Sequence, residues 1–350
     1  MRTMWVLCGL LLTSGSGRVR AQQSGTQTAE NPAKTREIRL TVEVTDKSGH
    51  PVSGLRQNDF TVLDNGRPVP LDFFYAHAGD LAEPGSESLV LVMDAINVDF
   101  NMLSAERTQV ETFLRSNQGH LSAPVSIAAV TETELNWITE TSADGNLLAG
   151  QLDQWQPHLQ PHPATSDAAL QERWQESIEG FDKILRHEAE RPGRKVMIWI
   201  SPGWPFIYST DLQTTDTLLH QWMDLIVAIS TNLREAQVTL EVVEPEGSAY
   251  LDSGVLWRPN LKPVKKWDRA EPADVTLQVL AIQSGGQVVH SSNDVASEIA
   301  KCVGDATAWY TLTIAERPDK PNTWHDLQVR VDQPDVVVRA GNGYYAQPQL

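Results

Sequence analysis

The oxygen-bearing side chains with the clearest chemical potential are Asp94, Asn97 and Asp99, which follow the unbroken apolar run Leu89–Met93. Such a run is typical of a strand that is buried on both faces in the middle of a parallel sheet. A carboxylate at the carboxyl end of that strand lies where open α/β sheets bind their ligands. This segment therefore predicts both a fold and the place of a site, but it does not specify a reaction.

Other residues capable of chemistry lack partners at a useful spacing. His158 and His162 are four residues apart, but the prolines around them disfavour a shared helix face, and two ligands are too few for a zinc site. Cys302 lies next to Lys301 and Val303 on an apolar stretch, which predicts a buried and inert thiol. The sequence contains no Gly-x-Ser-x-Gly, P-loop or dinucleotide-binding motif.

Two further segments could belong to a binding surface. Ser201 and Trp204 follow the expected core strand 195–200 and are predicted at the same sheet edge as Asp94. Trp204 there either covers a ligand groove or packs into the protein. Residues 244–274 form a long irregular stretch, which is either a contact surface for an acidic partner or a solvated loop. The aromatic and basic residues of this stretch are Trp257, Lys262, Lys265, Lys266, Trp267 and Arg269.

The elements that position these residues alternate between strands and helices from residue 88 to residue 306. Strands connected through helices favour right-handed crossovers and a mostly parallel sheet. Ser166 is the expected N-cap of a helix over 167–190, whose apolar residues recur at helical spacing. The other expected elements are strands at 88–94, 124–130, 137–141, 195–200, 238–243 and 287–290, and helices at 102–117, 147–155, 211–235, 273–284 and 294–304.

Both ends of the chain alternate with the period of a β-strand. In residues 37–80, apolar and polar residues alternate from Ile38 to Val44, and Asn65-Gly66 favours a tight type I′ hairpin. Residues 307–350 show the same alternation. We expect these two segments to pack together as a β-sandwich that is interrupted by the inserted α/β domain, 88–306.

The N-terminus has the pattern of a secretion signal. Arg2 precedes the short apolar core Met4–Leu12, and Val19-Arg20-Ala21 fits a cleavage site. Residues 1–21 are therefore expected to be removed near Ala21, and 22–36 to form a flexible leader. Nine apolar residues are too few to span a bilayer. The sequence predicts a secreted or periplasmic protein whose mature chain is not inserted in a membrane.

The charge balance limits the classes of partner. The chain has 28 basic and 45 acidic residues, a net charge of −17 at pH 7. Nucleic acid and anionic membranes would repel such a chain, so neither is expected as a general partner.

The order of several motifs resembles the secreted von Willebrand factor A (VWFA)-related domain proteins of acidobacteria. The resemblance runs from about residue 38 to the end of the chain. It implies a von Willebrand A-like α/β domain with a mostly parallel, doubly wound sheet, flanked by β-sandwich segments from both termini. The segments that carry it are Val44–Leu55, Asp59–Gly66, Leu89–Asp94, Val196–Gly203, Ser284–Gln287, Trp309–Leu312 and Gly343–Ala346.

The resemblance also implies where a divalent cation would bind. A-type domains hold Mg²⁺ through an Asp-x-Ser-x-Ser motif after the first strand, with a Thr and an Asp from later loops, because this ion prefers oxygen ligands. Asp94 and Thr165 match the first aspartate and the threonine. Ile96 and Val98 replace both serines, and Ser201 replaces the second aspartate. Unless Asn97 and Asp99 substitute, we expect Mg²⁺ binding to be weak or absent.

We therefore interpret the sequence as a noncatalytic, adhesion-type protein-binding module with a degenerate metal site and no required cofactor. The expected contact rim comprises Asp94, Asn97, Asp99, Thr165, Ser201 and Trp204. Two alternatives stay open: an envelope hydrolase using Asp94 and Asp99 near a loop histidine, and a carbohydrate-binding protein using exposed tryptophans.

Overall fold

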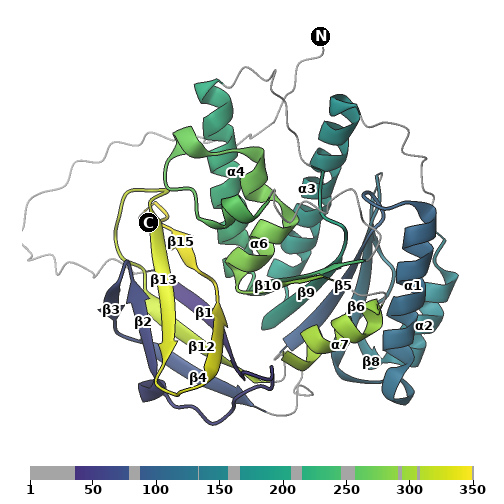
Figure 1. The fold of residues 1–350 in the computed structure, drawn as a ribbon, viewed down its shortest axis with the longest axis horizontal. Helices are drawn as coiled ribbons and strands as arrows, with labels where there is room; N and C mark the ends of the chain where they lie inside the picture. The colour runs from purple at the N-terminus through teal and green to yellow at the C-terminus, as the bar shows by residue number, and fades with distance from the viewer. Residues whose placement is uncertain are drawn as a thin grey trace, which may run out of the picture. The chain divides into compact units, whose positions relative to one another are not determined.

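A mostly parallel sheet forms the centre of the described structure (Figure 1). The computed structural model describes residues 36–78, 87–132, 134–156, 166–205, 215–245, 257–290, 294–305 and 308–348, all within one compact unit that spans 35–349. The strand order is β11-β10-β9-β5-β6-β7, with β8 also pairing with β6. The parallel strands are β5 (Glu87–Asp94), β6 (His120–Val130), β9 (Arg194–Ile200), β10 (Val238–Glu244) and β11 (Val288–His290). The prediction of a mostly parallel sheet is thus confirmed.

Two short strands close one side of this sheet in the antiparallel direction. They are β7 (Leu135–Trp137) and β8 (Ser142–Asp144), both paired with β6. The sequence predicted a strand at 137–141, which overlaps β7 only at Trp137, so that prediction was wrong in position. The reason is local: Ile138 and Thr139 both donate backbone hydrogen bonds to Ile127, and Thr139 Oγ1 accepts from Ile127 N, so the chain turns away there.

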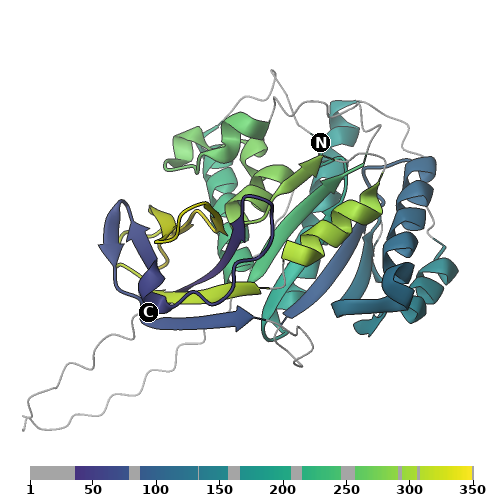
Figure 2. The same cartoon turned by 60° about the horizontal axis from the view of Figure 1, so that its bottom comes forward.

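Helices cover both faces of the parallel sheet (Figures 1 and 2). Along β5, Leu89, Leu91 and Met93 enter one core, and Val90 and Val92 enter the other, because successive strand residues point to opposite faces. Helices α1 (Phe100–Arg115), α2 (Gly145–Gln154) and α7 (Val295–Asp305) pack on the first face. Helices α3 (Asp167–Ala189), α4 (Asp216–Glu235) and α6 (Leu277–Ser284) pack on the second face.

Side-chain caps fix where several helices begin. Ser166 accepts a hydrogen bond from Ala169 N, which confirms it as the N-cap of α3. Thr215 caps α4 in the same way, so that helix begins five residues later than the sequence suggested. The stretch 257–275 contains the 3₁₀ helices Arg258–Leu261, Trp267–Arg269 and Pro272–Val275, which the sequence analysis had treated as irregular. Two further 3₁₀ helices span Gln57–Asp59 and Ser116–Gly119.

Strands from both ends of the chain share two antiparallel sheets, ordered β14-β1-β12-β4 and β15-β13-β2-β3. Asn65 and Gly66, with φ of 49° and 76°, form the β2–β3 turn, as the Asn-Gly pair predicted. The domain boundaries expected at 80, 88 and 306 stay predictions. The strands are β1 (Glu37–Asp46), β2 (Phe60–Asp64), β3 (Arg67–Val69), β4 (Phe73–Ala78), β12 (Ala308–Ala315), β13 (Trp324–Val331), β14 (Val336–Ala340) and β15 (Gly343–Tyr345). Among the described helices, none is long and apolar enough to cross a membrane.

Candidate functional site

Asp94 ends the central strand β5, and its carboxylate is fully buried. Oδ1 accepts hydrogen bonds from the backbone N–H groups of Ile96 at 3.2 Å and Asn97 at 3.1 Å. Oδ2 accepts from Ser201 Oγ at 2.7 Å and from Trp199 Nε1 at 3.2 Å. The amide Nδ2 of Asn97 lies 3.0 Å and 2.9 Å from the two oxygens. The sequence prediction that Asp94 and Ser201 share one sheet edge is therefore realised as a direct contact.

These donors define what the carboxylate of Asp94 can do. Burial raises the pKa of Asp94, and the hydrogen bonds from Asn97, Ser201 and Trp199 act against that rise. A carboxylate has about four lone-pair positions, and protein donors are directed at both oxygens. The group is therefore engaged in holding its own loop and the end of β9, and little acceptor capacity is left for a ligand.

Asn97 links the Asp94 loop to helix α3. Its Nδ2 also lies 2.9 Å from Ser177 Oγ, and Ser177 Oγ donates to Arg173 O at 2.8 Å. The Asn97 amide thus stands between the Asp94 carboxylate and the α3 hydroxyl. This is a neutral N–H donor in the place where an adhesion-type cation would need oxygen ligands.

The residues at this edge do not fit an adhesion-type cation site. Ile96 and Val98, which replace the two serines, are buried in the cores on opposite faces of the sheet. Thr165, the other candidate metal ligand, lies outside the described residues. Within the described ranges, no group of three or more His, Cys, Asp or Glu side chains could hold a metal ion. No step of a mechanism can be derived through a metal here.

Ser201 and Trp204 extend from the end of β9 toward the protein interior. Ser201 Oγ accepts a hydrogen bond from Gly203 N at 3.0 Å. Gly203 has a φ of 104°, which favours glycine. The Trp204 ring is 1% exposed and meets Phe181 and Trp199 edge to face, with centroids 5.5 Å and 5.8 Å away. Of the two interpretations of Trp204, packing is the one observed.

Asp99 and Phe100 form the exposed end of the same loop. Asp99 caps helix α1 by accepting from Met102 N at 2.8 Å. Phe100, the first residue of α1, is 68% exposed. Phe100 was not predicted as a rim residue, because an aromatic residue beside a helix cap is equally compatible with packing.

Glu106 is a second residue that the sequence analysis missed. It lies on α1 and is 2% exposed, and neither carboxylate oxygen has a hydrogen-bond partner in the described structure. Burial, followed by the nearby charges of Asp94 and Asp99, holds the pKa of Glu106 well above its ordinary value. Its spacing in the sequence could have predicted this burial. Glu106 lies three residues after Leu103 and four before Val110, so all three share the buried side of the helix.

Comparisons with known proteins find structures that are distantly similar to this chain. No family model and no curated protein matches it. The PilB minor pilin from Streptococcus sanguinis is similar at 10% identity and TM-score 0.35, over 64% of this chain and 62% of that chain. The pilus adhesin SpaC from Lactobacillus rhamnosus GG is similar at 10% identity and TM-score 0.38, over 85% and 49%. The SpRpn10 VWA domain is similar at 8% identity and TM-score 0.23, over 47% and 79%. Likeness at this level carries no argument about fold or function.

The residues named for the two alternative functions are already engaged, are mostly buried or lie outside the described part of the chain. Asp94 and Asp99 serve as acceptors for loop and helix donors, and His158 and His162 lie outside the described residues. Among the tryptophans that the structure describes, Trp267 is the one that counts as exposed, at 37%. The thiol of Cys302 is buried, as predicted.

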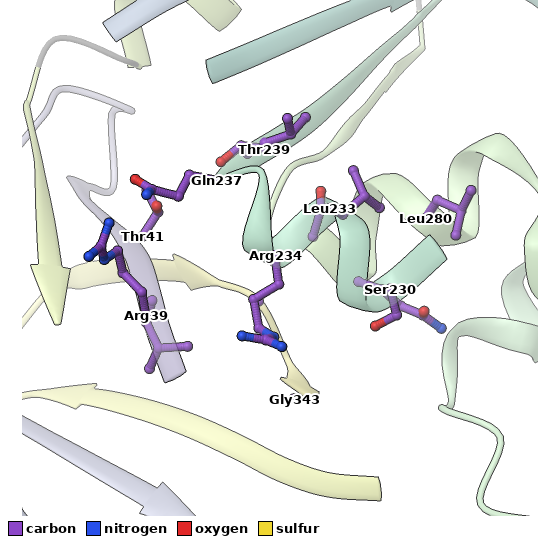
Figure 3. A pocket seen from close by; sticks show the side chains of 14 residues that line it. Arg39, Thr41, Ser230, Leu233, Arg234, Gln237, Thr239, Leu280 and Gly343 are labelled. Carbon is purple, nitrogen blue, oxygen red and sulfur yellow. The ribbon is translucent and has the colours of Figure 1, made fainter. Parts of the chain in front are cut away.

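A separate pocket lies at the opposite end of the sheet strands (Figure 3). It is lined by Arg39 of β1, by Arg234 near the end of α4, and by Gln237 and Thr239 at the start of β10. Burial lowers the pKa of Arg234, whose guanidinium lies 3.5 Å from Glu235. A cation in the last turn of a helix stabilises the helix C-terminus, which accounts for Arg234 without a ligand.

Proposed function

We propose that this chain is a noncatalytic, secreted or periplasmic protein-binding module of von Willebrand A-like architecture. Its contact rim consists of the loops at the carboxyl edge of the parallel sheet, after Asp94, around Thr165 and after Ile200. The observation that carries the proposal is the engagement of the Asp94 carboxylate by donors from its own loop and from β9. This makes the edge a rigid platform for loops, which suits binding better than reaction.

An exposed aromatic residue at this edge supports a protein partner. Phe100 is 68% exposed and directly follows Asp99, whose carboxylate fixes the first turn of α1. Aromatic side chains, Phe included, are enriched at the cores of protein interfaces relative to the rest of the surface. The carboxyl edge of an open α/β sheet is also where ligands bind in this class of fold. We therefore assign Phe100 to the rim together with Asn97 and Asp99.

Binding at this rim should not need a metal ion. Both oxygens of Asp94 are engaged by N–H and O–H donors, and Ile96 and Val98 supply no hydroxyl. The site is a degenerate form of the adhesion-type metal site, in which hydrogen bonds stabilise the loop instead of a cation. The pattern of residues 1–21, which is typical of a secretion signal, supports the assignment to the secreted or periplasmic space.

The rim is tested by partner capture with matched variants. The mature chain is immobilised and exposed to the envelope fraction of its own organism, with and without EDTA. We expect a captured protein to persist in EDTA, to be lost with Phe100→Ser, and to be retained with Phe73→Ser. Phe73 is 51% exposed on strand β4, so this control removes a similar apolar surface away from the rim.

Two outcomes contradict the proposal. One is capture that EDTA abolishes, which would make the rim metal-dependent. The other is capture that is equally affected by Phe100→Ser and Phe73→Ser, which would place the contact elsewhere.

A further inference from the structure

A cluster of basic side chains forms an exposed patch on this acidic chain. We call it the basic patch: Lys262, Lys265, Lys266 and Arg269, arranged around Trp267. All four cations are exposed. In the part of the chain that the structure describes, none of the four forms an ion pair with a carboxylate. These four exposed cations, without an ion-pair partner among the described residues, contrast with the net charge of −17 of the chain.

The basic patch is anchored on helix α4 through ring stacking. Trp267 stacks on His220 with ring centroids 4.0 Å apart and an interplanar angle of 22°. His220 lies in the first turns of α4, close to the cap Thr215. Trp267 remains 37% exposed, so part of its side chain is available to a partner. The patch therefore combines a stacked aromatic ring with exposed cationic side chains.

The position of α4 places the basic patch at the same edge as Asp94. Helix α4 follows strand β9, so its N-terminal end lies at the carboxyl edge of the parallel sheet (Figure 1). The patch touches that end of α4 through Trp267 and His220. The loop after Asp94 and the loop after Ile200 leave the same edge. The basic patch thus extends the proposed rim.

Two of the acids near the patch, Glu271 and Asp274, are hydrogen-bonded by Asn260, whereas Asp216 and Asp268 are exposed. Asn260 Nδ2 donates to Glu271 Oε1 at 2.6 Å and to Asp274 Oδ1 at 2.9 Å. Asp274 is buried, and Asp268 is an exposed acid between Trp267 and Arg269. The patch keeps an excess of positive charge, which is complementary to a negatively charged partner surface.

We propose that the basic patch binds an acidic, Asp- and Glu-rich segment of the partner protein, with Trp267 as the aromatic anchor. This inference rests on the proposed function, because it assigns a chemistry to the partner of the same rim. Carboxylates of the partner pair with Lys262, Lys265, Lys266 and Arg269, and its chain packs over the exposed side of the indole. Pairs of this kind steer association and weaken as salt screens them.

A peptide titration tests the partner chemistry directly. The probe is a fluorescein-labelled oligo-glutamate peptide, with an oligo-glutamine peptide of equal length as the neutral comparison, and binding to the mature chain is followed by fluorescence anisotropy. We expect saturable binding of the glutamate peptide that weakens at high salt, and no binding of the glutamine peptide. The triple variant Lys265→Glu, Lys266→Glu, Arg269→Glu should weaken binding by about tenfold or more.

The matched control changes the net charge equally. Lys183→Glu, Lys320→Glu and Arg330→Glu reverse three exposed cations outside the basic patch and should leave peptide binding within about twofold. Trp267→Ala should weaken binding while the salt dependence is retained. Equal losses in the two triple variants would overturn the proposal, as would dextran sulfate binding as tightly as the glutamate peptide, because the surface would then bind polyanions in general.

Failure of this inference can be distinguished from failure of the proposed function. If Phe100→Ser abolishes capture of the native partner and the basic-patch triple variant does not, the rim stands and the acidic-segment proposal is wrong. If both variants leave capture unchanged, the rim itself is wrong.

Discussion

At the residue scale, the sequence predicted where the site residues lie better than it predicted which side chains they contact. Asp94 and Ser201 follow neighbouring parallel strands, so strand order alone brings them together. The contact from Asn97 to Ser177 depends on how one loop meets α3, which no local pattern encodes. Glu106 could have been found from its phase on α1, because a carboxyl among Leu103 and Val110 must be buried with them.

The buried carboxyl of Glu106 yields a stability prediction with a defined sign. Its pKa is held well above the ordinary 4.5 by burial, so the folded chain keeps a proton that the unfolded chain has lost. This contribution to the free energy of unfolding therefore falls as the pH rises above about 4.5. Glu106→Met should stabilise the protein at pH 7 by about 1 to 3 kcal/mol, because it removes two oxygens that have no hydrogen-bond partner.

Urea unfolding at two pH values checks the Glu106 prediction. The gain from Glu106→Met should be larger at pH 7 than near pH 4.5, and Glu106→Gln should remove the pH dependence with a smaller gain. A loss of stability at pH 7 in both variants would mean that this carboxyl has a stabilising partner.

At the element scale, periodicity predicted most strands and helices. The predicted boundaries were wrong where a cap or a turn determines the end of an element. Alternation placed the end strands, and the Asn65-Gly66 turn was correct in type. Helix α4 begins after its predicted start because the Thr215 hydroxyl caps it. Residues 257–275 contain 3₁₀ helices, which have no apolar periodicity in the sequence. Such features depend on single hydrogen bonds, whereas the central strands depend on long apolar runs.

The edge strand β4 provides a pH prediction through His77. Its imidazole stacks on the indole of Trp309, with ring centroids 4.3 Å apart. Burial, followed by the charge of Arg194, lowers the pKa of His77 to about 4. The unfolded chain takes up this proton near 6.5, so the contribution of His77 to stability is full above that pH and is lost as the pH falls toward 4. In His77→Phe, which retains a flat ring on Trp309, the Tm should fall less between pH 7 and pH 4.5 than in the wild type. Parallel Tm curves for the two proteins would contradict the assignment.

At the scale of the whole molecule, buried charge joins the end strands to the parallel sheet. Glu43 of β1 pairs with Arg194, the first residue of β9, and with Arg339 of β14. The guanidinium of Arg194 also lies 5.1 Å from the ring centroid of Trp309 on β12. The sequence predicted that both ends pack together, because both alternate with period two. It could not predict these ion pairs, since their partners are up to 296 residues apart.

Removal of the Glu43 carboxylate tests this connection. Glu43→Gln takes the charge away from two arginines, one of them buried, and we expect a loss of about 3 kcal/mol or more in the free energy of unfolding. The exposed pair Lys47–Asp335 is the control, and Asp335→Asn should change stability by less than about 1 kcal/mol. Urea denaturation followed by tryptophan fluorescence measures both. Equal effects of the two substitutions would show that the buried pairs do not connect the sheets energetically.

The central claim is that protein donors, and not a cation, complete the Asp94 edge. Calorimetric titration of the mature chain with Mg²⁺ and Mn²⁺ tests it most directly. The account predicts no saturable heat at micromolar metal, and no difference between the wild type and Asp94→Asn. A micromolar binding heat that disappears in Asp94→Asn would show that the carboxylate is free to ligate, and would contradict the claim.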